Sequence, residues 1–237
     1  MPHSVGSMTW PNVLSWHPKQ VNARGGRIIA PLPAALCKRH FHVANLLYAH
    51  GAVVDVQDSL KRTPLYTASA SGQVDIMRWL LDHVADANAR ISAGLIWTPL
   101  HYATCNTHLE GVQVLLEHRA DINSQDSRGE TPLCVVLTGR SYTPEEKVVG
   151  IVRRLLEHGA DPNICNHSHS TALHLALFRG WLEVTRLLLN YGANVDEKDG
   201  NGRTPFQLSA SKGHHEITKL LFARGAVPQP LHYPLTF

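Results

Sequence analysis

Residues 171–196 read TALHLALFRGWLEVTRLLLNYGANVD, and this stretch decides the fold of the chain. A threonine opens a run of residues that favour helix, and Gly180 interrupts that run. A second run places Val184 and Leu188 at the spacing of one helical face. Gly192 follows, a residue that readily ends a helix in the left-handed conformation. The stretch therefore predicts two short helices joined by a turn and followed by a polar loop.

The same pattern recurs along most of the 237-residue chain. Its copies start at residues 30, 63, 98, 131, 171 and 204, which are 33, 35, 33, 40 and 33 residues apart. The starting motifs are Ala30-Pro31-Leu32-Pro33, Thr63-Pro64-Leu65-Tyr66, Thr98-Pro99-Leu100-His101, Thr131-Pro132-Leu133-Cys134, Thr171-Ala172-Leu173-His174 and Thr204-Pro205-Phe206-Gln207. Adjacent leucines, an alanine and an Asp/Asn-rich loop follow each motif. Recurrence at a nearly constant period is the signature of a repeat architecture.

This unit resembles the ankyrin repeat, and six matched copies extend the resemblance over nearly the whole chain. The resemblance implies an all-α solenoid of stacked helix-turn-helix units, with β-turn or hairpin loops between them. We expect a partial unit over residues 1–24, six repeats over 25–57, 58–92, 93–125, 126–165, 166–198 and 199–227, and a tail over 228–237.

Three departures from the pattern carry structural expectations. Val84 and Arg119 stand where other copies have a glycine after the second helix, so each costs about 1 kcal/mol if the backbone there is left-handed. The fourth repeat holds an insertion at about residues 140–147, between its two helices. Within it we expect Thr143 to cap a lengthened second helix that Pro144 opens.

The two ends of the chain differ from the central copies. Residues 13–24 align with the second half of a further unit, so the sequence begins partway through a repeat. In this respect it is similar to the ankyrin tails of large fungal NACHT-type proteins. After Pro228 the periodicity stops.

Composition narrows the class of function. The net charge of +3 is small, and its charges alternate in sign along the chain, which disfavours a nucleic-acid-binding face. No stretch approaches the roughly 18 apolar residues of a membrane helix, and the amino terminus lacks the pattern of a secretory signal. Four widely spaced cysteines predict reduced thiols. We therefore expect a cytoplasmic protein, with the nucleus as the alternative.

The family resemblance implies that a protein partner binds the loop tips and the exposed face of the first helices. Ten residues map onto these positions and are our candidate contacts: Leu60, Arg62, Leu95, Trp97, Asn106, Arg128, Glu130, Phe178, Arg179 and Arg203. We expect a non-catalytic monomer that takes no cofactor, metal or small-molecule substrate.

Trp97 is the leading candidate among them. Its loop, residues 91–97, is two residues longer than its counterparts and more apolar. Interface hot spots are enriched in Trp, Tyr and Arg, and Arg62 and Arg128 lie on the adjacent tips. The competing interpretation is that Trp97 folds back as a local cover over its own repeat.

A few residues of the sequence are of types that could serve other chemistry. His101 and His174 occupy the fourth place of the starting motif, where the resemblance implies that the imidazole ties loop to helix rather than acting in catalysis. Cys165, His167 and His169 form a conceivable metal set, but their alternate spacing on a loop tip differs from that of usual zinc sites. A second hypothesis for the whole chain is a structural spacer or an intramolecular scaffold within a longer multidomain protein.

Overall fold

The structure is a computed structural model, and it describes residues 21–22, 30–91, 94–139 and 143–228. Within these residues the regular secondary structure is helical, with no strand. The helices form six successive pairs: α2 (Pro31–Cys37) and α3 (Phe41–Ala49), α4 (Pro64–Ser71) and α5 (Val74–Asp82), α6 (Pro99–Cys105) and α7 (Leu109–Glu117), α8 (Pro132–Thr138) and α9 (Glu145–Glu157), α10 (Ala172–Arg179) and α11 (Leu182–Asn190), and α12 (Pro205–Ser211) and α13 (His215–Ala223).

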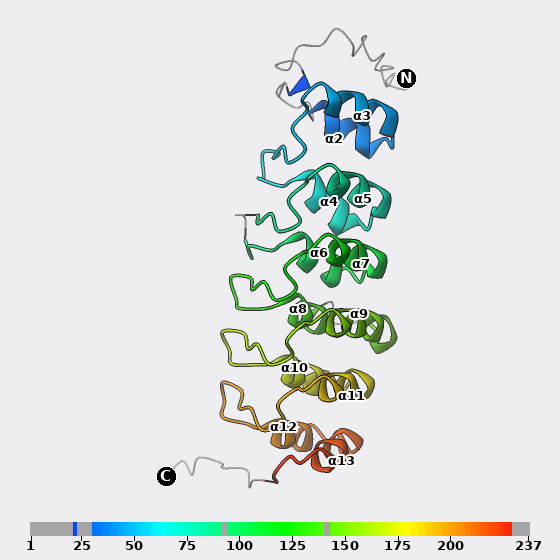
Figure 1. Cartoon of the computed structure of the whole chain (residues 1–237). Coiled ribbons are helices and arrows are strands. Elements are labelled where there is room, and N and C mark those ends of the chain that lie inside the picture. The colour runs from blue at the N-terminus through cyan, green and yellow to red at the C-terminus, as the bar shows by residue number, and fades with distance from the viewer. Residues whose placement is uncertain (1–20, 23–29, 92–93, 140–142, 229–237) are drawn as a thin grey trace, which may run out of the picture.

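The pairs stack one upon another in chain order (Figure 1). The first helix of each pair lies on the side from which the loops project, and the second helix lies on the other side. Pair α2–α3 is at one end of the stack and pair α12–α13 is at the other. The all-α solenoid that the resemblance to ankyrin repeats implies is therefore confirmed.

The starting motif forms the N-terminus of each first helix. Where proline follows the threonine it occupies the first helical turn, where its missing N–H leaves no bond unmade. The Oγ1 of Thr63 accepts the Tyr66 amide at 3.2 Å, which satisfies one of the unpaired N–H groups of α4. In α12, Thr204 and Gln207 complete a reciprocal capping box.

A left-handed residue follows each second helix, as the sequence predicts. Gly51, Gly159, Gly192 and Gly225 supply it in four repeats. Val84, with φ of 63°, and Arg119, with φ of 60°, take the same conformation in the other two. Both side chains therefore sit on a backbone that only glycine adopts without strain.

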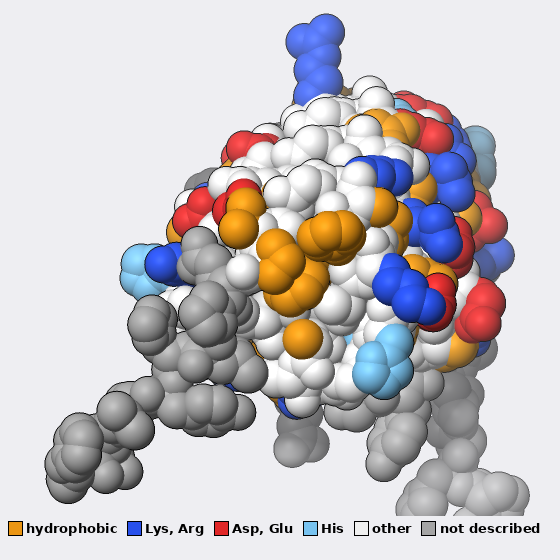
Figure 2. Space-filling model, turned by 90° about the horizontal axis from the view of Figure 1, so that it is seen from below, with side chains coloured by type: hydrophobic (Ala, Val, Ile, Leu, Met, Phe, Trp, Pro, Cys, Tyr) orange, Lys and Arg blue, Asp and Glu red, His pale blue; other side chains and the backbone are white. Residues whose placement is uncertain are grey.

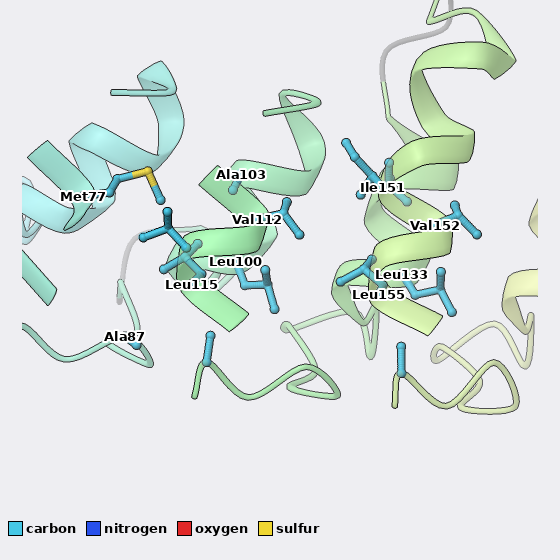
Figure 3. Close-up of a cluster of buried hydrophobic side chains, with 14 of the residues drawn as sticks. Met77, Ala87, Leu100, Ala103, Val112, Leu115, Leu133, Ile151, Val152 and Leu155 are labelled. Carbon is cyan, nitrogen blue, oxygen red and sulfur yellow. The ribbon is translucent and has the colours of Figure 1, made fainter. Parts of the chain in front are cut away.

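The core runs through the stack between neighbouring pairs (Figure 3). Leu100, Leu115, Ile151 and Leu155 are completely buried in it. The buried side chains of neighbouring pairs belong to one cluster, so the stability of each unit depends on its neighbours.

The insertion in the fourth repeat lengthens α9 to 13 residues, but the expected cap is wrong. The helix begins at Glu145, and Pro144 precedes it in an extended conformation, so Thr143 lies too early to cap. The extra turn instead carries Glu145, whose Oε1 accepts the amide of Val184 at 3.0 Å. This carboxylate supplies a cap to α11, whose own N-cap residue, Trp181, provides none.

Side chains in the loops after the second helices link consecutive repeats. The Oδ1 of Asn88 accepts the amide of Asp121 at 2.7 Å, one repeat further along. Four more bonds of this kind repeat the pattern: Asn22 with Val53, Asp55 with Asp86, Asn123 with Asp161 and Asn163 with Asn194. This ladder fixes the loop ends relative to one another.

Candidate protein-binding surface

Most of the described loop tips are folded by one Asp or Asn side chain. In each case an Oδ1 atom accepts the backbone amides of the residues two and four positions further along. The groups are Asp58 with Leu60 and Arg62, Asp126 with Arg128 and Glu130, Asn166 with Ser168 and Ser170, and Asp199 with Asn201 and Arg203. Such turns fix the tip backbone before any partner arrives.

Three aromatic side chains meet where the second and third repeats adjoin, and we call Tyr66, Trp97 and Tyr102 the aromatic cluster. The ring centroids of Tyr66 and Tyr102 are 4.3 Å apart in an edge-to-face arrangement. Those of Trp97 and Tyr102 are 4.9 Å apart in a similar arrangement. All three residues are partly exposed, so together they present aromatic surface to solvent across a repeat boundary.

Trp97 is held in place by polar and stacking contacts. Its Nε1 donates to Oδ2 of Asp126 on the next loop, at 2.8 Å. Its ring lies nearly parallel to that of His101, with centroids 6.2 Å apart and an interplanar angle of 15°. Trp97 therefore makes the contacts of a local cover, while its partial exposure leaves some of the indole free to touch a partner.

Arg62 and Leu60 lie on the tip next to the cluster. The Arg62 guanidinium pairs with Asp58 at 2.7 Å and lies 6.0 Å from the centroid of Tyr66. Leu60 is 56% exposed although it is a large apolar residue. Arg62 also lines a groove of about 790 Å³ between α2 and α4, which pack less closely than the other neighbouring first helices.

Four further candidates occupy the third and fourth repeats. Leu95 is partly buried, and its carbonyl accepts the amide of Ser127 at 3.0 Å. Arg128 is exposed on the following tip. Asn106 ends α6, where its Nδ2 donates to the Tyr102 carbonyl at 2.9 Å. Glu130 is partly buried, and burial followed by the nearby charge of Asp126 raises the pKa of its carboxyl group.

The remaining candidates form a separate group near α10 and α12. Phe178 is 60% exposed, and the Nζ of Lys212 lies 4.0 Å from its ring centroid. The guanidinium of Arg179 donates to the Gly139 carbonyl at 2.7 Å. Arg203 pairs with Asp199 at 2.8 Å. The ten candidates thus divide between the region of the aromatic cluster and this second region.

A family model described as ankyrin repeats, in three copies, matches residues 32–126, 91–140 and 145–230. The chain belongs to the ankyrin-repeat family. Ankyrin repeats are generally protein–protein interaction modules. The three matches together cover all six helix pairs of the ankyrin array.

Two residues of the aromatic cluster were missed among the sequence-based candidates. Tyr66 takes the fourth place of its starting motif, and Tyr102 takes the fifth place of the next one. In the ankyrin array these places approach each other across the repeat boundary, which brings the two rings together. Aromatic residues in adjacent outward places of neighbouring motifs were the available signal.

The histidines of the starting motif stabilise the ankyrin frame. The Nδ1 of His101 accepts the Thr98 amide at 3.2 Å, and its Nε2 lies 3.1 Å from the carbonyl of Glu130 in the next repeat. These two contacts are those of a neutral ring protonated on Nε2. Burial lowers the pKa of His101, and of His174 in the equivalent place of the fifth repeat.

Two other observations concern ligands and membranes. Among the residues that the structure describes, no three His, Cys, Asp or Glu side chains are grouped in a way that could hold a metal ion, and this includes Cys165, His167 and His169. In the same part of the chain, no helix is both long enough and apolar enough to span a bilayer.

Proposed function

We propose that this ankyrin array is a non-catalytic binding module that holds a protein partner against its loop tips and first helices, with the aromatic cluster at the centre. The observation that carries the proposal is the continuous, partly exposed strip formed by Arg62, Tyr66, Tyr102 and Trp97. Tyr, Trp and Arg are the residue types that dominate interface energetics. Leu60 and Ile96, exposed on the two adjacent tips, extend the apolar part of this strip.

The geometry favours binding because the strip is already ordered. Asp58 fixes the Arg62 side chain, and Asp126 fixes the indole of Trp97. Side chains that are held before association lose less conformational entropy when the partner docks. Burial, followed by hydrogen bonding with the Tyr66 side chain, raises the pKa of Tyr102, so its hydroxyl stays neutral at physiological pH. The partner segment that suits this strip presents apolar or aromatic side chains to the rings.

The proposed setting is the cytoplasm or the nucleus, where thiols remain reduced. None of the four cysteines, Cys37, Cys105, Cys134 and Cys165, forms a disulfide. The first two and the last are at least partly exposed, a state that reducing compartments maintain.

The test is quantitative capture from a lysate of the source cell with three matched baits. The first is the parent chain, and the second carries Tyr66→Ser and Tyr102→Ser, which removes two rings of the cluster. The third carries Phe178→Ser, which removes a more exposed aromatic ring from the second region. Thermal unfolding verifies that all three baits are folded.

We expect a set of proteins that the parent and the Phe178→Ser bait retain and the cluster variant loses. Equal capture by all three folded baits would contradict the proposed face. Specific capture by none would favour the spacer or intramolecular scaffold.

A further inference from the structure

The last repeat exposes to solvent a face whose equivalent is buried in every earlier repeat that the structure describes. The third residue of the starting motif is at most 1% exposed in the first five copies, which are Leu32, Leu65, Leu100, Leu133 and Leu173. Its counterpart in the sixth copy, Phe206, is only partly buried. The difference follows from position, because no described repeat follows α12 and α13 (Figure 1).

Two other places in the repeat show the same change. The seventh residue of the unit is buried in the first five copies, for example in Leu137 and Leu177, whereas Ala210 is exposed. Phe222 is 61% exposed, whereas its counterparts Leu81, Leu156 and Leu189 are at most 9% exposed. The counterpart in the first repeat, Tyr48, is 38% exposed. Tyr48 packs against Trp79 of the following repeat, with ring centroids 6.2 Å apart. Phe222 therefore points to where a following repeat would lie.

This end of the array has the chemistry of an interior face. Seen from below, hydrophobic side chains gather on the end of the stack (Figure 2). Phe206, Ala210, Leu220, Phe222 and Val227 supply partly or fully exposed apolar surface in α12, α13 and the residues after them. Terminal repeats that end a solenoid in water normally carry a polar outer face. An apolar end therefore requires something to cover it.

We propose that the chain's own residues 229–237 cover this apolar end face. They continue directly from Val227 and Pro228, which follow the buried Ala226 at the edge of the last repeat. Nine extended residues reach about 30 Å, whereas two packed helices are roughly 20 Å across. The segment is thus long enough to cross both α12 and α13.

The residue pattern of this segment matches such a role. Leu231, Tyr233, Leu235 and Phe237 alternate with His232, Pro234 and Thr236. In an extended chain this alternation places every large apolar side chain on one side and the others on the opposite side. Prolines at 228, 230 and 234 favour extended backbone and disfavour helix.

Tethering favours this occupant over a second molecule. A segment joined to the face by one or two residues has an effective local concentration in the millimolar range, which a free copy of the protein does not reach at working concentrations. This inference is independent of the proposed binding of a partner at the aromatic cluster.

The experiment is hydrogen exchange, followed by mass spectrometry, on three forms of the full chain. One is the parent, and one carries Leu231→Ser, Tyr233→Ser and Leu235→Ser on the apolar side of the segment. The matched control carries His232→Ser and Thr236→Ser on the other side. We expect amides of α13 to exchange about tenfold faster in the apolar-side variant and to keep the parent rate in the control.

A fourth variant changes the end face itself instead of the segment. Phe222→Ser lies on the exposed part of the proposed site, so we expect it to raise exchange of the amides in residues 231–237 while the fold persists. Unchanged α13 exchange in the apolar-side variant overturns the proposal. A second result would also overturn the proposal. If the protection of α13 amides increases with protein concentration and sedimentation shows a dimer, the face binds a second copy of the chain.

Discussion

The indole Nε1 of Trp97 donates a hydrogen bond to Oδ2 of Asp126, 2.8 Å away on the next loop. The other oxygen of the same carboxylate accepts the amides of Arg128 and Glu130. One buried side chain therefore folds its own tip and also fixes the most prominent aromatic residue of the preceding repeat. This arrangement connects two neighbouring parts of the proposed binding surface.

The first prediction concerns that connection. Asp126→Asn keeps one acceptor oxygen but turns an NH₂ group toward either the indole N–H or the loop amides, so two donors face each other. We expect a loss of about 1–3 kcal/mol in the free energy of unfolding. Trp97→Phe alone removes the donor and costs less. Urea unfolding of both single variants and the double variant gives the coupling energy, and independent additive losses would show that the bond contributes nothing.

A second prediction uses the left-handed positions. Val84→Gly relieves a β-branched residue with positive φ, so we expect the free energy of unfolding to rise by about 1 kcal/mol. The matched reverse change is Gly159→Val, because an added Cβ there meets no atom within 4 Å and only the backbone is strained. We expect it to destabilise by a similar amount. Thermal melts that move in the same direction for both variants would refute this explanation.

The third prediction is a dependence of stability on pH. Burial lowers the pKa of His101 and His174 below the ordinary value of about 6.5. The unfolded chain therefore takes up protons first as the pH falls below about 6.5, and the free energy of unfolding decreases until the folded pKa is passed. Gln207 occupies the same place in α12, where its Oε1 accepts the Thr204 amide at 3.0 Å.

Glutamine thus performs the same capping without titrating. We expect His101→Gln with His174→Gln to retain a folded array at pH 7.5 and to reduce the loss of stability between pH 7 and pH 5. Urea midpoints across this range measure the slope. An unchanged slope would place the pH dependence on other groups.

The fourth prediction concerns the end at α2 and α3. The groove between α2 and α4 leaves this pair less tightly joined to the stack than the central pairs are. Since repeat arrays are stabilised by nearest-neighbour contacts, we expect α2 and α3 to open before the rest. Amides of Leu36 and Leu47 should exchange faster than those of Leu115 and Leu155, although all four side chains are buried. Equal protection of all four would indicate one cooperative unit.

The sequence predicted the frame of this molecule because the frame depends on local rules. Threonine capping, helical spacing and a left-handed terminator act within about 33 residues and recur. Even the strained places, Val84 and Arg119, follow from comparing copies. The start of α9 was predicted one residue too early, because Pro144 is extended and precedes the helix instead of taking its first position.

The candidate surface was harder to predict for the same reason. The contact between Tyr66 and Tyr102 depends on how closely two repeats approach, which a motif does not encode. The prominence of Trp97 was visible in its long loop, but the role of Asp126 in holding it was not. Residues that act within a repeat could be predicted, whereas pairs that act between repeats required the structure.

Glu145 affects which repeats pack against each other while the chain folds. Stacked units with similar cores are partly interchangeable, so an array is prone to join the wrong neighbours or to skip one. The contact between Glu145 and the Val184 amide depends on the extra turn of α9, which only the fourth repeat carries among the pairs described. We therefore expect this contact to favour the packing of α11 against α9 over the packing of another second helix there. The insertion thus makes the boundary between the fourth and fifth repeats different from the boundaries between the other, similar repeats.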